Sequence, residues 1–184
     1  MELLKSNWIT LFEDQYRLPN GADCTYYHVS QNDAVMAIAI EQSESGLHTY
    51  IVNQYRHPIG QSIWQFPLGG INPETQDAVH AAKVELAEET GVTVGDTQYR
   101  GSFFSNPGFS NQRIHVCISS DIVSKTRPCL EESEYGLISR RVELSDIASM
   151  VSSGEMGDSW GIIGLHYLNQ YISDNPELET TLPS

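Results

Sequence analysis

Three closely spaced glutamates are the residues of this sequence best suited to chemistry. Glu85, Glu88 and Glu89 stand at positions i, i+3 and i+4, a spacing that places three carboxylates on one face of a helix. Like charges at this spacing repel each other, and anions are disfavoured in the last turns of a helix. A divalent cation removes both costs, because Mg²⁺ and Mn²⁺ prefer carboxylate oxygens as ligands. The spacing alone also fits a solvated acidic helix face.

The sequence around the glutamates indicates how they are positioned. A helix is expected from about residue 75 to residue 90, and Gly91 stands where helices commonly end. Before it, an expected strand ends in Phe66 and Pro67, and two glycines follow. A strand, a loop and a helix therefore frame the carboxylates, which favours the metal site over the solvated face.

This frame resembles the signature of a known family. The stretch GINPETQDAVHAAKVELAEETGV (70–92) resembles the Nudix box, G-x5-E-x7-R-E-U-x-E-E-x-G-U, where U is apolar. With Gly70 as the first glycine, the positions in register are Glu85, Leu86, Glu88, Glu89, Gly91 and Val92. The resemblance implies hydrolysis of a nucleoside diphosphate linked to another group, with Mg²⁺ or Mn²⁺ held by the three glutamates. It further implies that the backbone carbonyl of Leu68 or Gly69 joins the metal ligands.

Two positions of the box depart from the family pattern. Gln76 replaces the first glutamate and Val84 replaces the arginine. In the family this arginine helps to orient the metal-binding glutamates, often through an ion pair. Because the glutamate and the arginine of this ion pair are both replaced, neither charge is left buried without its partner. The loss of the pair nevertheless predicts reduced activity. The alternative is therefore a catalytically weak Nudix protein that binds a nucleotide sugar as a sensor or regulator.

Segments outside the box resemble the ADP-ribose and ADP-sugar pyrophosphatase branch of the family. NQYRHPIG (53–60), followed by WQFPLGGI (64–71), is similar to the branch pattern Q-[YF]-R-x-P before E-[LF]-P-A-G. SNPGFSNQRIH (105–115) is similar to its S-P-G-x-S segment. This resemblance implies cleavage of ADP-ribose or an ADP-sugar to AMP and a sugar phosphate, in a homodimer.

The same resemblance suggests which residues contact the substrate. Arg56 is expected to contact a phosphate, because a guanidinium offers paired hydrogen-bond donors; a surface arginine is the alternative. Trp8 and Tyr26 match positions at which the branch stacks adenine, an interaction worth about 1–3 kcal/mol per base. Core packing is the alternative for Trp8. Pro107 and Gly108 are expected in the substrate-binding loop, with an ordinary turn as the alternative.

A general base is expected in a later acidic loop. Branch members commonly carry a catalytic glutamate just before a late strand, and EESEYGLIS (131–139) resembles that segment. Glu134 aligns best, and Glu132 and Glu131 are the alternatives. Such a base would deprotonate a water whose pKa bound metal ions have already lowered. An acidic surface loop is the competing interpretation.

Composition narrows the class of protein. A length of 184 residues is typical of one domain, and we expect a single Nudix domain over 1–184. The net charge of −14 argues against nucleic acid as a partner. No apolar run approaches the roughly 20 residues of a membrane span, and we do not expect the first residues to act as a signal peptide, because they contain no long apolar segment. The three cysteines match neither a disulfide framework nor a zinc site. We therefore expect a soluble cytoplasmic domain without a membrane partner.

The order of expected elements predicts the fold class. Strands dominate the first 70 residues, a helix carries the glutamates, more strands follow, and two helices are expected at 144–153 and 159–172. This order indicates an α/β fold with helices on the faces of a mixed sheet, and the family implies an α/β/α sandwich. An N-terminal antiparallel hairpin is expected within 1–32, a region that the resemblance assigns to dimerisation. Residues 175–184 are expected to form a flexible tail.

Overall fold

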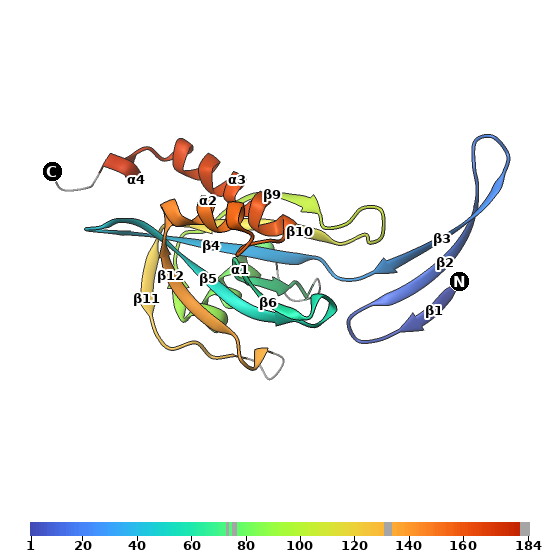
Figure 1. Cartoon of the computed structure of the whole chain (residues 1–184), viewed down its shortest axis with the longest axis horizontal. Helices are drawn as coiled ribbons and strands as arrows, with labels where there is room; N and C mark the ends of the chain where they lie inside the picture. Colours follow the sequence, from blue (N-terminus) through green and yellow to red (C-terminus); the bar gives the residue numbers. More distant parts are fainter. Residues whose placement is uncertain (73, 75–76, 131–133, 181–184) are drawn as a thin grey trace.

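The computed structural model describes residues 1–72, 74, 77–130 and 134–180. A mixed sheet forms the centre of the molecule, helices lie on its faces, and a smaller antiparallel sheet extends from it (Figure 1). Within the described residues, the strands of the central sheet are β4 (Ala34–Ser43), β5 (Gly46–Arg56), β6 (Gln61–Gln65), β7 (Leu68–Gly70), β9 (Gln98–Phe104), β10 (Arg113–Ser119) and β12 (Ile138–Glu143).

The order of the strands confirms the expected mixed sheet. The main path runs β12-β5-β4-β10-β9, while β6 pairs with β5 and β7 pairs with β4. The β4–β10 pair is parallel, and the other pairs in this sheet are antiparallel. Strand β4 therefore lies in the middle of the sheet, where the apolar sequence AVMAIAI predicts a strand that is buried on both faces.

Alternating side chains of β4 divide the core into two clusters. Val35 and Ala37 belong to the cluster that includes Ala81 of α1 (Ala78–Glu85). Met36 and Ile38 belong to the cluster on the other face. That second cluster includes side chains from α2 (Leu144–Ser153) and α3 (Ser159–Asp174). The sheet thus lies between α1 on one face and α2 and α3 on the other, which confirms the α/β/α sandwich.

Helix α3 approaches the sheet closely at a glycine. A Cβ atom added at Gly164 would lie 2.6 Å from ring atoms of Phe66 and 2.8 Å from Sδ of Met36. Real Cβ atoms do not come this close to their neighbours, so the absence of a side chain permits the approach. This contact fixes α3 against the segment between β6 and β7.

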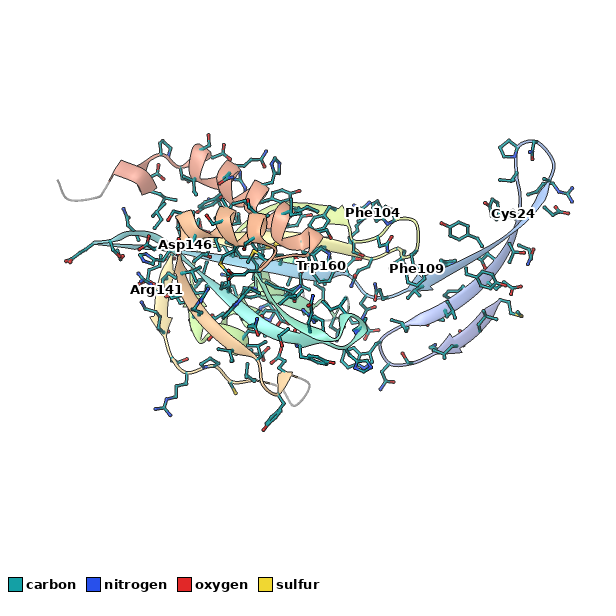
Figure 2. All side chains as sticks on the ribbon, viewed as in Figure 1. Cys24, Phe104, Phe109, Arg141, Asp146 and Trp160 are labelled. Carbon is teal, nitrogen blue, oxygen red and sulfur yellow. The ribbon has the colours of Figure 1, made fainter. Side chains whose placement is uncertain are left out.

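The N-terminal residues form a three-stranded antiparallel arm. Its strands are β1 (Glu2–Lys5), β2 (Thr10–Arg17) and β3 (Asp23–Ser30), in the order β1-β2-β3. The arm projects from the body of the molecule, with Cys24 near its distal end (Figure 2). The antiparallel hairpin expected within residues 1–32 is present as β2 and β3, and β1 was not expected. Leu3, Leu4 and Tyr27 of the arm are exposed.

Several local features differ from the sequence expectations. The strand expected to end in Phe66 and Pro67 stops at Gln65, and β7 begins after Pro67, because proline has no N–H for the ladder. The unexpected strands β8 (Val92–Val94) and β11 (Ile122–Lys125) pair with each other in a separate ribbon. A short 3₁₀ helix, η1 (His57–Ile59), follows β5.

The C-terminal part adds one more short helix. Helix α4 (Glu177–Thr180) lies in the segment expected to be flexible, and its Leu178 packs against the core. Residues 181–184 lie outside the described part of the chain. Among the described helices, none is both long enough and apolar enough to span a membrane.

Candidate active site

The helix that carries the glutamates changes its geometry where they lie. Asp77 caps the N-terminus of α1, and its Oδ1 accepts a hydrogen bond from the His80 N–H at 2.7 Å. After Glu85 the helix continues as a π-helical turn, η2 (Leu86–Thr90), which ends at Gly91 with φ of +74°. The sequence predicts a regular helix over this stretch, so the π turn is a correction. Single π turns are frequently found at functional sites.

The π turn helps to explain which carboxylates come together. Its wider i→i+5 turn favours alignment of residues four to five apart over residues three apart. Ligand oxygens of Glu85, Glu89 and Glu134 lie within 4.8 Å of one another, as found among the described residues. Glu88 lines the same cavity but is not part of this trio. Glu134, about 45 residues away in sequence, therefore joins two of the three predicted metal ligands.

The glutamates line a cavity of about 430 Å³. It combines the acidic cluster with a basic residue, an aromatic residue and a glycine-rich backbone segment. The lining residues are Trp8, Gln54, Arg56, Leu68, Gly69, Gly70, Glu85, Glu88, Glu89 and Glu134. The structure thus gathers the predicted metal-ligating residues, Arg56, Trp8 and the predicted base around one space.

A glycine allows Glu85 to reach this cavity. A Cβ atom added at Gly69 would overlap the carboxylate of Glu85, whereas one added at Gly70 would meet nothing within 4 Å. The carboxylate of Glu85 therefore rests directly against the backbone of β7. The first glycine of the pair has a steric role, which the sequence motif does not specify.

Glu89 lies in an environment that opposes its negative charge. It is only 2% exposed, and burial, followed by the nearby Glu85 and Glu134, raises its pKa to about 8. The Leu68 N–H donates a hydrogen bond to Glu89 Oε2 at 3.2 Å, and Arg56 also favours the charged form. Three converging carboxylates suit a hard divalent cation, whose charge would relieve this repulsion. The residues present therefore fit Mg²⁺ or Mn²⁺.

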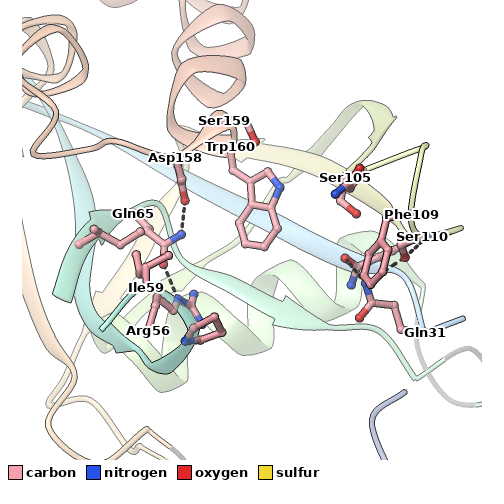
Figure 3. Close-up of a pocket in the computed structure, with 14 residues that line it drawn as sticks. Gln31, Arg56, Ile59, Gln65, Ser105, Phe109, Ser110, Asp158, Ser159 and Trp160 are labelled. Atoms are coloured by element: carbon pink, nitrogen blue, oxygen red, sulfur yellow. Dashed lines mark hydrogen bonds between the residues drawn. The ribbon is translucent and has the colours of Figure 1, made fainter. Parts of the chain in front are cut away.

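Arg56 lies between two groups of acidic residues. Its Nε donates a hydrogen bond to Gln65 Oε1 at 2.8 Å, and Gln65 Nε2 donates in turn to Asp158 Oδ2 (Figure 3). Burial lowers the pKa of Arg56, while Glu89 and Asp158 favour its charged form. An arginine held through Nε presents the rest of its guanidinium in a fixed orientation.

The structure separates the two aromatic residues predicted to stack adenine. Trp8 is 79% exposed and lines the acidic cavity. Tyr26 lines a different cavity together with Pro107, and its hydroxyl donates to the Gly108 carbonyl oxygen at 2.7 Å. In one chain, therefore, Tyr26, Pro107 and Gly108 lie together, apart from Trp8 and the glutamates.

Of the two positions that depart from the motif, the structure describes Val84 and not Gln76. Val84 is half-buried on α1. Gln76, Glu131 and Glu132 lie outside the described residues. Of the three candidate bases, Glu134 is therefore the one whose position the structure gives.

Sequence reasoning missed the link from Gln65 to Asp158. These residues are 93 positions apart, and no motif joins them. One local signal was present, because an aspartate before an apolar helical segment is a common N-cap. Asp158 indeed caps α3, and its Oδ1 accepts from the Gly161 N–H at 2.6 Å.

The fold and the carboxylate cluster together define a class of protein, an α/β/α sandwich whose helix carries an acidic cluster suited to a divalent cation. The NUDIX domain model matches residues 30–151. The chain therefore belongs to the Nudix family and is a Nudix hydrolase.

Comparisons with individual proteins agree with the expected branch. The chain is 26% identical over 168 residues to an ADP-ribose pyrophosphatase of Bacillus subtilis (strain 168), covering 91% of this chain and 88% of the relative. It is 27% identical over 155 residues to an ADP-ribose pyrophosphatase of Mycobacterium tuberculosis, covering 84% and 73%. It is also 28% identical over 169 residues to the methanol dehydrogenase activator of Bacillus methanolicus, covering 91% and 88%. These similarities confirm the resemblance to the ADP-ribose pyrophosphatase branch.

A solved structure supports the fold. The structure titled "Crystal structure of ADP compounds hydrolase" aligns with a TM-score of 0.79 at 14% identity, covering 95% of this chain and 91% of that chain. At this identity the match bears on the fold alone.

Proposed function

We propose that this Nudix hydrolase cleaves the diphosphate bond of a nucleoside diphosphate sugar in a reaction that depends on Mg²⁺ or Mn²⁺. ADP-ribose or an ADP-sugar is the substrate most consistent with the relatives that are named ADP-ribose pyrophosphatases. The products are then AMP and a sugar phosphate. One observation carries the proposal: Glu85, Glu89 and Glu134 converge within 4.8 Å in a cavity that Arg56 also lines.

Each part of the cavity has a role in this reaction. The carboxylates of Glu85, Glu88 and Glu89 would hold the cation, with a backbone carbonyl of Leu68 or Gly69 as a further ligand. A cation held there would neutralise phosphate charge and lower the pKa of water. Arg56 binds a phosphate oxygen, because a guanidinium retains its charge even when partly buried.

The remaining roles concern the attacking water and the base of the nucleotide. Glu134 accepts the proton of that water, since its carboxylate faces the other two glutamates. Trp8 offers an exposed aromatic face to the nucleobase at the same cavity. Tyr26 and Pro107 line a separate cavity, and Gly108 accepts the hydrogen bond of the Tyr26 hydroxyl, so these three residues form a second surface for the substrate.

The assembly and location remain part of the proposal. The exposed apolar side chains of the N-terminal arm, including Leu3 and Leu4, suit pairing with a second copy of the chain. The family resemblance supports a homodimer, and the widely spaced cysteines support a cytoplasmic location; sedimentation would test the dimer.

A second candidate function is a catalytically weak protein that binds a nucleotide sugar as a sensor or regulator. Val84 and Gln76 motivate it, because the supporting ion pair of the box is absent. A relative of similar identity is named an activator of another enzyme. The converging glutamates favour the catalytic proposal instead.

A panel of nucleotide sugars tests the proposed reaction. The chain is incubated with ADP-ribose, ADP-glucose and UDP-glucose in Mg²⁺ or Mn²⁺, and release of phosphomonoester is measured. Glu89→Gln and Glu88→Gln are expected to reduce turnover by at least about 100-fold, because each removes a ligand charge. Glu44→Gln makes the same charge change in an exposed turn and serves as the matched control.

Two outcomes would contradict the proposal in different ways. No turnover of any nucleotide sugar, combined with tight binding by calorimetry, would favour the sensor. Turnover that survives both substitutions would instead place the reaction away from these glutamates.

A further inference from the structure

A buried amide joins Arg56 to the N-terminus of α3. Arg56 Nε donates a hydrogen bond to Gln65 Oε1 at 2.8 Å, and Gln65 Nε2 donates in turn to Asp158 Oδ2 (Figure 3). Gln65 is only 3% exposed, so both polar ends of its amide need partners within the protein. The two contacts give each end a partner, and they connect β5 and β6 to the start of α3.

We propose that Asp158 is a positioning residue for Arg56 and that it acts through the amide of Gln65. The inference rests on the proposed function, in which Arg56 binds a phosphate oxygen of the substrate. Asp158 keeps the amide oxygen of Gln65 facing Arg56, and that oxygen holds the guanidinium by Nε. The N–H groups of Nη1 and Nη2 are then left to contact phosphate.

The order of donors and acceptors allows these contacts to form in one direction only. The Nε–H of an arginine can only donate, and an ionised carboxylate can only accept. The amide of Gln65 has one accepting end and one donating end, so its oxygen must face Arg56 and its nitrogen must face Asp158. Without the carboxylate, the amide could turn over and present its N–H groups to the guanidinium, which would then lose its contact.

Asp158 is itself held in place and carries a charge that supports Arg56. Its Oδ1 accepts a hydrogen bond from the Gly161 N–H at 2.6 Å as the N-cap of α3. One carboxylate oxygen therefore serves the helix, and the other accepts from Gln65. Burial lowers the pKa of Arg56, whereas Glu89 and then Asp158 favour its charged form. Asp158 lies outside the lining of the acidic cavity, so it stabilises this charge without competing for the cation.

A pair of substitutions that reverses the polarity of these contacts tests the proposal. In Asp158→Asn the side-chain oxygen still caps α3, because asparagine is also a good N-cap, but an N–H group now faces Gln65. The single oxygen of Gln65 cannot serve both of its neighbours. Gln65→Glu alone places two carboxylates against each other. Combining the two substitutions restores the contacts, because the new carboxylate accepts from both neighbours and the net charge equals that of the wild type.

Hydrogen exchange of the Arg56 Nε–H, followed by NMR in the ligand-free full chain, reports the contact directly. Arg56→Lys identifies the signal by its loss. We expect exchange to be about tenfold faster in Asp158→Asn than in the wild type, and slow again in the double variant. The melting temperature of Asp158→Asn should be unchanged. Asp146→Asn is the matched control, since Asp146 is exposed in the first turn of α2.

Binding of ADP-ribose, measured by calorimetry in Mg²⁺, should follow the same order. We expect affinity to fall about tenfold in Asp158→Asn and to return to within about threefold of the wild type in the double variant. In the Arg56→Lys background, Asp158→Asn should cause no further loss, because Asp158 acts through Arg56. A purely structural role would produce neither the recovery nor the dependence on Arg56.

Several results would overturn the inference. One is equally slow exchange of the Arg56 Nε–H in the wild type and in Asp158→Asn. Another is that the losses of the two single variants add in the double variant, and a third is an equal loss of ADP-ribose affinity in the Arg56→Lys background. A lower melting temperature in Asp158→Asn that the double variant does not restore would assign Asp158 to the cap alone. A wild-type chain that neither binds nor hydrolyses a nucleotide sugar contradicts the proposed function instead, because the exchange measurement needs no ligand.

Discussion

Replacing Gly69 with alanine should impair metal binding while the fold survives. The new Cβ would overlap the carboxylate of Glu85, so one of the two must move. The carboxylate is the end of a flexible side chain, and it must retreat by more than about 1 Å to reach van der Waals contact. Mg²⁺ requires ligand oxygens close to 2.1 Å in near-ideal geometry. The retreating carboxylate therefore leaves the ligand set.

The expected loss is that of one charged ligand among three. We expect Mg²⁺ affinity to fall about 10–100-fold, equivalent to roughly 1.4–2.7 kcal/mol. Titration of Mg²⁺ followed by calorimetry measures this affinity, and thermal unfolding in EDTA shows whether the fold is intact. Gly70→Ala is the control, because its Cβ meets nothing within 4 Å, and it should leave Glu85 in place. Unchanged Mg²⁺ affinity in Gly69→Ala would refute the reasoning, as would an equal loss in Gly70→Ala.

Three further predictions follow from burial and charge. Because the pKa of Glu89 is raised to about 8, the free energy of unfolding of the metal-free protein should fall as the pH rises from about 4.5 to 8. Thermal unfolding in EDTA measures this fall, which should be smaller in Glu89→Gln. An equal dependence of the melting temperature on pH in both proteins would contradict the prediction. Over the same pH range Mg²⁺ affinity should increase by up to about tenfold per pH unit, because the cation displaces the Glu89 proton, whereas an affinity independent of pH would exclude this competition. Gly164→Ala should destabilise the protein by about 1–3 kcal/mol through overlap with Phe66, measured by urea unfolding, and unchanged stability would show that α3 can shift.

A cluster of ion pairs around Glu41 gives the free energy of unfolding the opposite dependence on pH, in the acidic range. Lys125 and Arg141 contact the carboxylate of Glu41 at 2.7 and 2.8 Å. Although burial raises the pKa of Glu41, hydrogen bonds from Lys125, Tyr50 and Arg141 lower it to about 2. The stability that this group contributes is therefore present above about pH 4.5 and lost as the pH falls towards 2. Acid unfolding of Glu41→Gln should show a weaker dependence across that window, and an unchanged slope would contradict the assignment.

Much of the fold was predictable because its sequence patterns are local. The apolar run of β4 predicted a strand buried on both faces, and the side chains from Ala34 to Ile40 indeed divide between two core clusters. Gly91 marked the end of the glutamate helix, and its positive φ accounts for the signal. Strands β1, β8 and β11 were missed because they are short and their pairing depends on partners distant in sequence.

The site was predictable where a motif carried it and not elsewhere. The box located Glu85 and Glu89, and alignment of a second segment suggested Glu134, which the structure brings beside them. The π turn could not be predicted, since helix periodicity does not distinguish it from a regular turn over five residues. The hydrogen bond from Gln65 to Asp158 joins β6 to the N-terminus of α3, and no local pattern encodes a contact between residues so distant in sequence.

In the proposed reaction, water attacks a diphosphate bond at the cavity formed by Glu85, Glu89, Glu134 and Arg56. The most direct test is mass spectrometry of ADP-ribose incubated with the chain and Mg²⁺ in water labelled with heavy oxygen. We expect AMP and a sugar phosphate, with one labelled oxygen in one of the two products, and no products in EDTA or with Glu89→Gln. Unlabelled products, or intact ADP-ribose and intact ADP-glucose after prolonged incubation with either Mg²⁺ or Mn²⁺, would contradict it.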